Sequence, residues 1–189
     1  MIRVIAGIYK GKRLRKVPSP LVRPMPDKLK SALFNILRDE VRGTAILDGF
    51  AGTGSIGIEA LSRGASRAVF IEHFAPAVRI LKHNLAKCGA EAGARVIFEE
   101  FNRGVIRLGK EKARFHIIFL DPPYRLIDER NPLKVLKKRD VLSPGGLIVL
   151  RHHFKTRFEA KYFERVRQVT LGDDTLSFYK SAESAIADG

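Results

Sequence analysis

The fold is decided by the stretch Ala45-Ile46-Leu47-Asp48-Gly49-Phe50-Ala51-Gly52-Thr53-Gly54-Ser55-Ile56-Gly57. A short apolar run, typical of a buried strand, passes into a glycine-rich turn, and residues 55–63 then predict a helix. Gly52 and Gly54 allow the backbone to approach a ligand closely, and Gly57 allows the helix to pack tightly on a strand. Strand, glycine-rich turn and helix in this order predict a Rossmann-like unit that binds a nucleoside-containing cofactor, against the alternative of a tight turn without a ligand.

Two acids indicate which cofactor this unit binds. Residues 68–72 predict the next strand, and Glu72, twenty residues beyond Gly52, ends it with a carboxylate that can accept both hydroxyls of a ribose. Asp48 lies four residues before Gly52, where it would repel the pyrophosphate of a dinucleotide. This position disfavours a dehydrogenase and favours S-adenosylmethionine, which carries a sulfonium and an ammonium group and no phosphate.

A third strand, residues 95–98, ends at Glu99-Glu100-Phe101, where an acid can meet the adenine amino group. The residues expected to bind the cofactor are Asp48, Phe50, Ala51, Gly52, Thr53, Gly54, Glu72, His73, Glu100 and Phe101.

The chemistry is expected at Phe119-Leu120-Asp121-Pro122-Pro123-Tyr124, which ends a buried strand over residues 115–120. Prolines supply no N–H group and stiffen the chain, so this turn offers one acid, carbonyl acceptors and one aromatic ring. Such a turn can accept hydrogen bonds from a flat amine while the ring stacks on the same molecule. Ligands of open α/β sheets bind outside the carboxyl ends of strands, which fits this position. The predicted catalytic residues are Asp121, Pro122 and Tyr124.

The remaining pattern predicts an α/β sandwich. Helices are expected over residues 27–41, with Asp27 as N-cap, and over residues 76–87 and 131–139, and a further strand follows a Gly145-Gly146 turn at residues 147–150. Two last strands, residues 163–170 and 175–179, flank Gly172-Asp173-Asp174 and predict an antiparallel hairpin. The expected organisation is a basic arm over residues 1–26, a main domain over residues 27–180 and a loose tail over residues 181–189.

The chain carries 35 Lys and Arg against 20 Asp and Glu, a net charge of +15 that indicates a polyanionic partner. The basic arm is interpreted as a hairpin that binds RNA through Lys10, Lys12, Arg13, Arg15 and Arg23, rather than as a solvated tail. A single cysteine excludes an intrachain disulfide, and His152 and His153, adjacent on a strand, point to opposite faces. We therefore expect no metal, with both histidines exposed or facing RNA. No apolar run approaches membrane-spanning length, so a cytoplasmic protein with no membrane contact is expected. We also expect a monomer.

Several of these segments together resemble one family. The glycine-rich stretch from Asp48 to Ala65 and the turn at residues 121–124 are similar to those of bacterial 16S rRNA (guanine-N2)-methyltransferases of the RsmD type. The segments at residues 3–11, 23–35 and 172–179 resemble the same family, so the similarity covers nearly the whole chain. Departures occur at Met25-Pro26, where the family usually has Thr-Thr or similar, and at Ser31, His73-Phe74 and Arg151, where it commonly has an acid.

The resemblance implies a class I S-adenosylmethionine-dependent methyltransferase sandwich, with a mostly parallel sheet and an antiparallel C-terminal hairpin. It implies methylation of the exocyclic N2 amine of a guanine in ribosomal RNA or the small ribosomal subunit. The guanine would be extruded into the site, stacked on Tyr124 and bound through its amine by Asp121 and the Pro122 carbonyl. The alternatives are an N6-adenine methyltransferase acting on DNA or another RNA, and a non-catalytic RNA-binding assembly factor.

Overall fold

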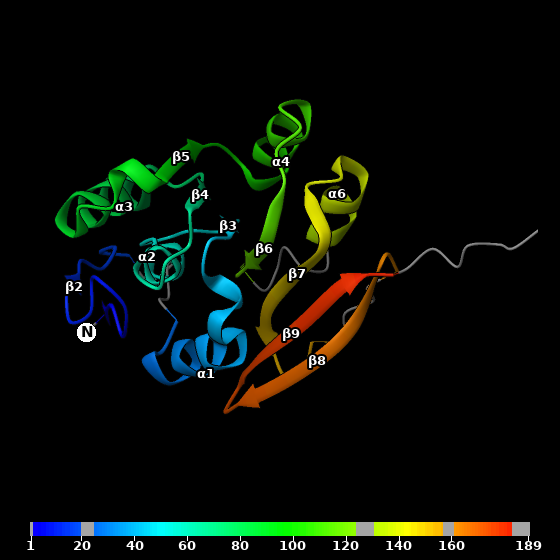
Figure 1. The fold of residues 1–189 in the computed structure, drawn as a ribbon, viewed down its shortest axis with the longest axis horizontal. Helices are drawn as coiled ribbons and strands as arrows, with labels where there is room; N and C mark the ends of the chain where they lie inside the picture. The colour runs from blue at the N-terminus through cyan, green and yellow to red at the C-terminus, as the bar shows by residue number, and fades with distance from the viewer. Residues whose placement is uncertain (1, 20–24, 124–130, 157–160, 183–189) are drawn as a thin grey trace, which may run out of the picture.

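The computed structural model describes residues 2–19, 25–123, 131–156 and 161–182. Its centre is a seven-stranded sheet in the order β5-β4-β3-β6-β7-β9-β8 (Figure 1). The strands are β3 (Ala45–Asp48), β4 (Arg67–Glu72), β5 (Ala94–Phe98), β6 (Phe115–Leu120), β7 (Leu142–His153), β8 (Phe163–Leu171) and β9 (Asp174–Ser181). The strands from β5 to β7 run parallel, and β9 pairs antiparallel with both β7 and β8. The predicted Rossmann-like sandwich with its C-terminal hairpin is therefore confirmed.

Helices cover both faces of this sheet (Figure 1). One face packs against α1 (Asp27–Leu37), α2 (Ser55–Ser62) and α3 (Ala75–Cys88), and the other against α4 (Phe101–Lys110) and α6 (Pro132–Arg139). Two short 3-10 helices, η1 (Arg38–Val41) and η2 (Glu91–Gly93), precede β3 and β5. Buried aliphatic and aromatic side chains fill both layers, which is the arrangement that parallel strands with two apolar faces require.

Some element boundaries differ from those predicted. The first helix begins with Asp27 as its first residue after Pro26, and it ends at Leu37 because Arg38 adopts a left-handed φ of 44°. The strand predicted at residues 147–150 extends from Leu142 to His153 and runs through Gly145-Gly146, which was expected to be a turn. Helix α4 was not predicted.

The basic arm forms a small antiparallel hairpin, β1 (Ile2–Arg3) with β2 (Arg13–Leu14), against α2 and α3 (Figure 1). Its main anchor is Glu59 in α2, which is fully buried. The Glu59 carboxylate accepts hydrogen bonds from the backbone N–H of Ile5 at 2.7 Å and of Ala6 at 3.0 Å. Lys30, also fully buried, places its Nζ 3.5 Å from Glu59 Oε2 and donates to the Arg3 carbonyl at 2.6 Å. The arm is thus fixed to the sandwich by a buried ion pair.

Candidate active site

The order of the strands places the site. From β3 the chain passes to β4 and β5 on one side and later to β6 and β7 on the other, so β3 and β6 flank the crevice at which such sheets bind ligands. Asp48 pairs with Phe70 of β4 and with Phe119 of β6. Glu72 and Asp121 each lie two residues beyond those partners, and the two-residue period of a strand directs all three carboxylates to one side of the same edge.

The glycine-rich turn is held between its neighbours. The N–H of Gly49 donates to the Phe119 carbonyl at 2.9 Å, and the N–H of Ala51 donates to the Ile71 carbonyl at 3.0 Å. A Cβ on Gly54, whose φ is +78°, would lie 2.2 Å from the Leu81 side chain. These contacts hold the turn in place, and Gly54 leaves no room for a side chain.

Gly57 in α2 packs on the ring of Phe70, and a Cβ there would lie 2.2 Å from a ring carbon. This is the close contact of helix and strand that the sequence predicts. Of the other predicted residues in the turn, Ala51, Gly52 and Thr53 are buried and Phe50 is half-buried.

Asp48 is almost completely enclosed, with 1 % of its surface exposed, and its Oδ2 accepts a hydrogen bond from the Gly57 N–H at 3.1 Å. Burial raises the pKa of Asp48 to about 7, and the negative charges of Asp121 and Glu72 add to this shift. A cation that enters the crevice would stabilise the ionised form, because opposite charges favour it.

Glu72 is oriented by three backbone donors. Its Oε2 accepts from the Gly52 N–H at 2.8 Å, and its Oε1 accepts from the N–H groups of His73 and Phe74, also at 2.8 Å. The His73 side chain is 62 % exposed and its Nδ1 lies 3.5 Å from Glu72 Oε1. The carboxylate thus links the glycine-rich turn to the end of β4 at the rim of the crevice.

An aromatic wall lies beside this acid. Phe50, from the glycine-rich turn, and Phe101, the first residue of α4, stack with ring centroids 4.7 Å apart and an interplanar angle of 22°. Glu100 occupies the N-cap position of α4 and is half-buried. Stacked rings next to an acid form a surface that suits a flat heterocycle with an amino group.

The proposed catalytic turn leaves β6 on the other side of Asp48. Asp121 is half-buried and Pro122 is buried, whereas Tyr124 lies outside the described residues. Burial raises the pKa of Asp121 above its ordinary value, and the nearby Arg151 guanidinium opposes this shift. Arg151 Nη1 donates to Asp121 Oδ2 at 2.8 Å, and Arg151 Nε donates to Asp174 Oδ1 at 2.9 Å. Neither the role of Arg151 nor that of Asp174 was predicted.

The cationic residues predicted to bind RNA lie along the hairpin, where Lys10, Lys12, Arg13 and Arg15 are exposed. Arg23 lies outside the described residues. The Lys12 Nζ donates to the carbonyls of Lys87 at 3.2 Å and Cys88 at 3.0 Å, and thereby caps the C-terminus of α3.

One residue that the sequence did not single out connects this hairpin to the crevice. Asn84 of α3 is fully buried. Its Oδ1 accepts from the Arg15 N–H at 2.8 Å, and its Nδ2 donates to the carbonyls of Arg15 at 3.1 Å and Thr53 at 2.9 Å. The basic arm and the glycine-rich turn are therefore joined through a single amide side chain.

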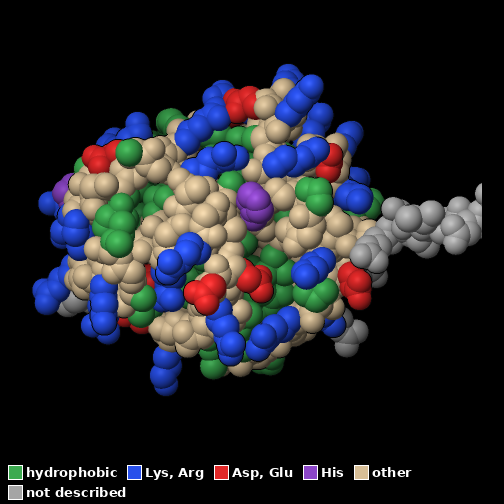
Figure 2. Space-filling model, viewed as in Figure 1, with side chains coloured by type: hydrophobic (Ala, Val, Ile, Leu, Met, Phe, Trp, Pro, Cys, Tyr) green, Lys and Arg blue, Asp and Glu red, His purple; other side chains and the backbone are tan. Residues whose placement is uncertain are grey.

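The outer surface is strongly cationic. Figure 2 shows Lys and Arg side chains scattered across the face in view, including the region of α4 and α6, with fewer Asp and Glu side chains between them. Other exposed cations lie on α6, on β8 and in the segment between β7 and β8. They are Lys134, Lys137, Lys138, Lys155, Lys161, Arg165 and Arg167. A predominantly cationic surface, outside an edge that carries three carboxylates, would attract polyanions to the surface and cations to that edge.

His152 is buried, and the prediction that both histidines are exposed or face RNA is wrong for it. Its Nε2 lies 2.9 Å from the Ser177 hydroxyl, and burial lowers the pKa of its imidazole. The described part of the chain contains no cluster of three or more His, Cys, Asp or Glu side chains able to hold a metal ion. Within the same residues, no helix is long and apolar enough to span a membrane.

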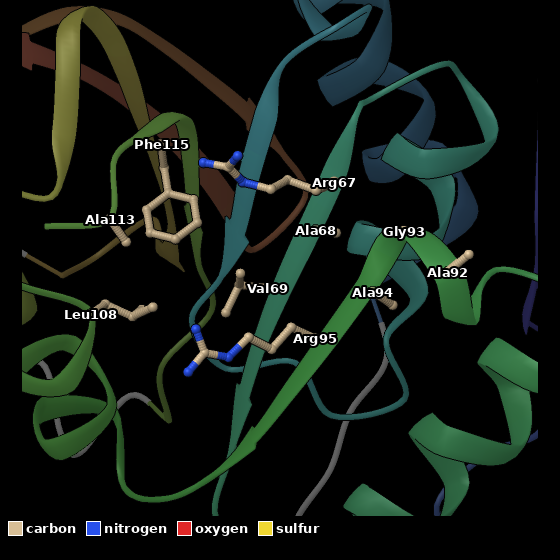
Figure 3. A pocket seen from close by; sticks show the side chains of 10 residues that line it. All are labelled: Arg67, Ala68, Val69, Ala92, Gly93, Ala94, Arg95, Leu108, Ala113 and Phe115. Carbon is tan, nitrogen blue, oxygen red and sulfur yellow. The ribbon is translucent and has the colours of Figure 1, made fainter. Parts of the chain in front are cut away.

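A separate depression of about 310 Å³ lies between the beginnings of β4 and β5 and the end of α4 (Figure 3). Ala68, Val69, Leu108 and Phe115 are among the residues around it, and Arg95, also at its border, forms an ion pair with Glu111. Because the depression is at the amino ends of the strands, it is separate from the carboxyl edge that carries the three acids.

Comparisons with known proteins agree with this fold. Residues 2–180 match the family model described as conserved hypothetical protein 95. Ribosomal RNA small subunit methyltransferase D of Haemophilus influenzae is 34 % identical over 149 residues, which are 78 % of this chain and 76 % of that protein. The solved structure of a hypothetical protein of Thermus thermophilus is 31 % identical, with a TM-score of 0.82, and the match covers 94 % of this chain and 98 % of that one.

A more distant structure has the same fold. The crystal structure of an RNA methyltransferase from Salinibacter ruber, in complex with S-adenosyl-L-homocysteine, is 20 % identical with a TM-score of 0.67. The match covers 88 % of this chain and 98 % of that one.

Proposed function

The chain belongs to the conserved hypothetical protein 95 family of RsmD-type methyltransferases, and from this membership we propose that it methylates a guanine of small-subunit rRNA. The proposed reaction transfers the methyl group of S-adenosylmethionine to the exocyclic N2 amine of that guanine. The single observation that carries the proposal is the adjacency of two turns: the glycine-rich turn after β3 and the Asp121-Pro122 turn after β6 leave neighbouring strands at the same edge.

The residues of the first turn fit S-adenosylmethionine. The site combines glycines, whose missing side chains leave room for a ligand, with three carboxylates and a pair of stacked rings. This combination suits a cationic ligand that contains a ribose and an adenine. Asp48 would attract the ammonium and sulfonium charges, Glu72 would accept the ribose hydroxyls, and Glu100 with Phe50 and Phe101 would hold the adenine. The Salinibacter ruber structure, which contains the demethylated product of this donor, supports the same choice. When bound, the donor supplies an electrophilic methyl group.

The second turn supplies the acceptor chemistry. Asp121 and the Pro122 carbonyl would accept hydrogen bonds from the amine of an extruded base, which draws the nitrogen lone pair out of conjugation with the ring. The nitrogen then forms its bond to the methyl carbon as the carbon–sulfur bond breaks, and the acceleration comes chiefly from proximity and orientation. The methylated amine loses one proton to Asp121 or to water, so the charges balance. Tyr124 would stack on the base.

The basic arm and the cationic surface would hold the phosphates outside the crevice, where neutralised charges release counterions. The expected partner is ribosomal RNA or the assembling small subunit, and the expected location is the cytoplasm, where that subunit is made.

The test is methyl transfer from labelled S-adenosylmethionine to small subunits, free rRNA and duplex DNA, each supplied separately. The rRNA and the subunits come from cells that lack the native enzyme. Label recovered as N2-methylguanosine supports the proposal, label only as N6-methyladenine in DNA overturns the substrate, and donor binding without transfer favours a non-catalytic assembly factor. Asp121→Ala should abolish turnover while donor binding is kept. Unchanged turnover of this variant would refute the role of Asp121.

A further inference from the structure

We propose that Arg151 is a positioning residue for Asp121, and that it ties the turn of the C-terminal hairpin to the reaction through Asp174. The inference rests on the proposed function, because it assigns Asp121 the task of binding the target amine. Arg151 is the tenth residue of β7, and only 7 % of it is exposed. Its guanidinium spans the two carboxylates at 2.8 Å and 2.9 Å, so it is fixed at both ends.

The register of the sheet sets this contact. β6 and β7 are parallel with Leu120 beside Leu150, so Arg151 within β7 lies at the level at which Asp121 follows the end of β6. β7 and β9 are antiparallel with His153 beside Asp174, which brings the start of β9 to the same edge. The end of β6, the end of β7 and the start of β9 therefore meet at the Arg151 guanidinium. Strand pairing alone brings them together.

The contact with Arg151 leaves one oxygen of the Asp121 carboxylate available to accept a hydrogen bond from a substrate. Arg151 binds Oδ2, and within the described residues Oδ1 has no hydrogen-bond donor. A carboxylate held by a cation at one oxygen cannot rotate freely, so its other oxygen has a fixed direction in which it can accept from an amine. Arg151 would thus set the orientation of the acceptor without itself touching the substrate.

The same contact affects the charge of Asp121. Among the described residues, the charged groups around this carboxylate are Asp48 on β3, Arg151 on β7 and Asp174 on β9. Burial raises the pKa of Asp121, Asp174 raises it further, and Arg151 is the group that lowers it. Without the guanidinium, Asp121 would hold a proton at higher pH, and a protonated carboxyl group loses part of its capacity to accept from the amine.

The position of Asp174 gives a role to the segment Gly172-Asp173-Asp174, which the proposed reaction alone leaves unexplained. Gly172 adopts a φ of +63°, which permits the tight reversal between β8 and β9. The Phe154 N–H donates to the Asp173 carbonyl at 3.0 Å and holds the turn against the end of β7. The turn therefore presents Asp174 to Arg151 in a fixed geometry.

The experiment measures methyl transfer to rRNA against pH for Arg151→Met, Arg151→Lys and Asp174→Asn, with Asp173→Asn as the matched control. The control removes an equal charge one residue away, and Asp173 makes no ion pair among the described residues. Donor binding by calorimetry and thermal unfolding are recorded for every variant.

We expect Arg151→Met to lower kcat on the order of 100-fold at neutral pH, with little change in the KM for either substrate. The acidic limb of its pH profile should move up by about one pH unit or more, because an opposing charge close to Asp121 has been removed. Arg151→Lys should recover part of kcat and bring the acidic limb most of the way back to its wild-type position. Asp174→Asn should lower kcat less than Arg151→Met and move the acidic limb down rather than up, because Asp174 raises the pKa of Asp121. Asp173→Asn should behave as the wild type.

A loss of thermal stability with an unmoved pH profile would overturn the proposal, since a purely structural arginine has that effect. If Asp121→Ala is inactive but the Arg151 variants keep the wild-type profile, the proposed function stands and this inference fails. If the wild type methylates no nucleic acid, the proposed function fails. Carboxyl NMR then follows the titration of Asp121 in the wild type and in Arg151→Met, where an upward shift supports the coupling and identical curves overturn it.

Discussion

Replacing Glu59 with Gln tests how the basic arm is held. The substitution keeps the size of the side chain but removes its charge beneath the hairpin. In the wild type the carboxylate accepts from two backbone N–H groups and from Arg63 Nε at 2.9 Å, and it faces the ammonium of Lys30. An amide has only one oxygen that can accept, so its NH₂ group would face one of these N–H donors without forming a hydrogen bond.

The loss of stability expected for Glu59→Gln follows from the burial of this ion pair. Neither Glu59 nor Lys30 exposes any side-chain surface, and removal of one partner from such a pair costs about 3–5 kcal/mol. At this chain length about 2–4 °C of melting temperature is lost per kcal/mol, so a decrease on the order of 10 °C is expected. The opposite substitution, Lys30→Met, should cost less, about 1–2 kcal/mol, because Glu59 keeps Arg63 and both backbone donors.

The direction in which the stability of Glu59→Gln changes with pH can also be predicted. Burial lowers the pKa of Lys30, and Glu59 opposes that shift. In Glu59→Gln the pKa of Lys30 falls further, so the folded state releases a proton that the unfolded chain retains up to a pH of about 10. The unfolded state then binds more protons, and the free energy of unfolding rises with pH. The destabilisation should therefore become smaller as the pH rises toward about 10.

The assay is denaturant unfolding of the wild type, both single variants and the double variant, with Glu40→Gln as the control. Glu40 is exposed, and its replacement removes the same charge from the surface. The double variant should be more stable than the sum of the two single losses predicts, since no unpaired charge remains. Strictly additive losses, or a Glu59→Gln midpoint equal to that of Glu40→Gln, would refute the reasoning.

Three further predictions concern single positions. Gly57→Ala should cost about 1–3 kcal/mol in urea unfolding, because its Cβ would lie 2.2 Å from the Phe70 ring, and an unchanged midpoint would contradict the packing. Asn84→Leu should speed amide exchange at Arg15 and cost about 1–3 kcal/mol for each buried group left unpaired, whereas unchanged exchange would show that Asn84 does not hold the arm. Asp48 keeps its proton up to a pH of about 7 in the folded state, so the wild type should lose stability relative to Asp48→Asn as pH rises from about 4 to 7. A pH-independent difference between the two proteins would exclude this titration.

The central part of the fold was predictable because its signals are local. An apolar run, glycines at fixed offsets and a following amphipathic segment specify strand, turn and helix without reference to the rest of the chain. Right-handed crossovers then place successive parallel strands in one sheet. This is why Asp48, Glu72 and Asp121, far apart in the sequence, were expected at one edge.

Helix α4 escaped prediction because glycines interrupt its pattern. Its inward residues Phe101, Val105 and Leu108 have helical spacing, but Gly104 and Gly109 weaken the signal. Tertiary packing explains Gly104, since a Cβ there would lie 2.8 Å from Ile71. Similarly, Gly146 reads as a turn in sequence, yet it lies inside β7, where a Cβ would come within 3.0 Å of the His116 carbonyl.

The buried polar contacts could not be predicted from the sequence, for a different reason. Asn84 meets Arg15 across 69 residues, Lys30 meets Glu59 across 29, and Arg151 meets Asp121 across 30. Nothing near any of these residues in the sequence marks it as buried, because long cations and amides are usually exposed. Only the tertiary packing of helices, arm and sheet reveals that such a group has a partner.

The opposite signs of the crevice and the outer surface favour base extrusion on physical grounds. The crevice concentrates Asp48, Glu72 and Asp121, and the charges of two of these acids raise the pKa of the third. A phosphate would be repelled from that edge, while the surface around it, with a net charge of +15 for the whole chain, attracts the RNA backbone. An RNA strand held at that surface can reach the methyl donor only with a neutral part, and the base is the neutral part that rotation about the backbone can deliver. The charge distribution thus fits the proposed arrangement, with a cationic donor inside, a polyanion outside and an uncharged base between them.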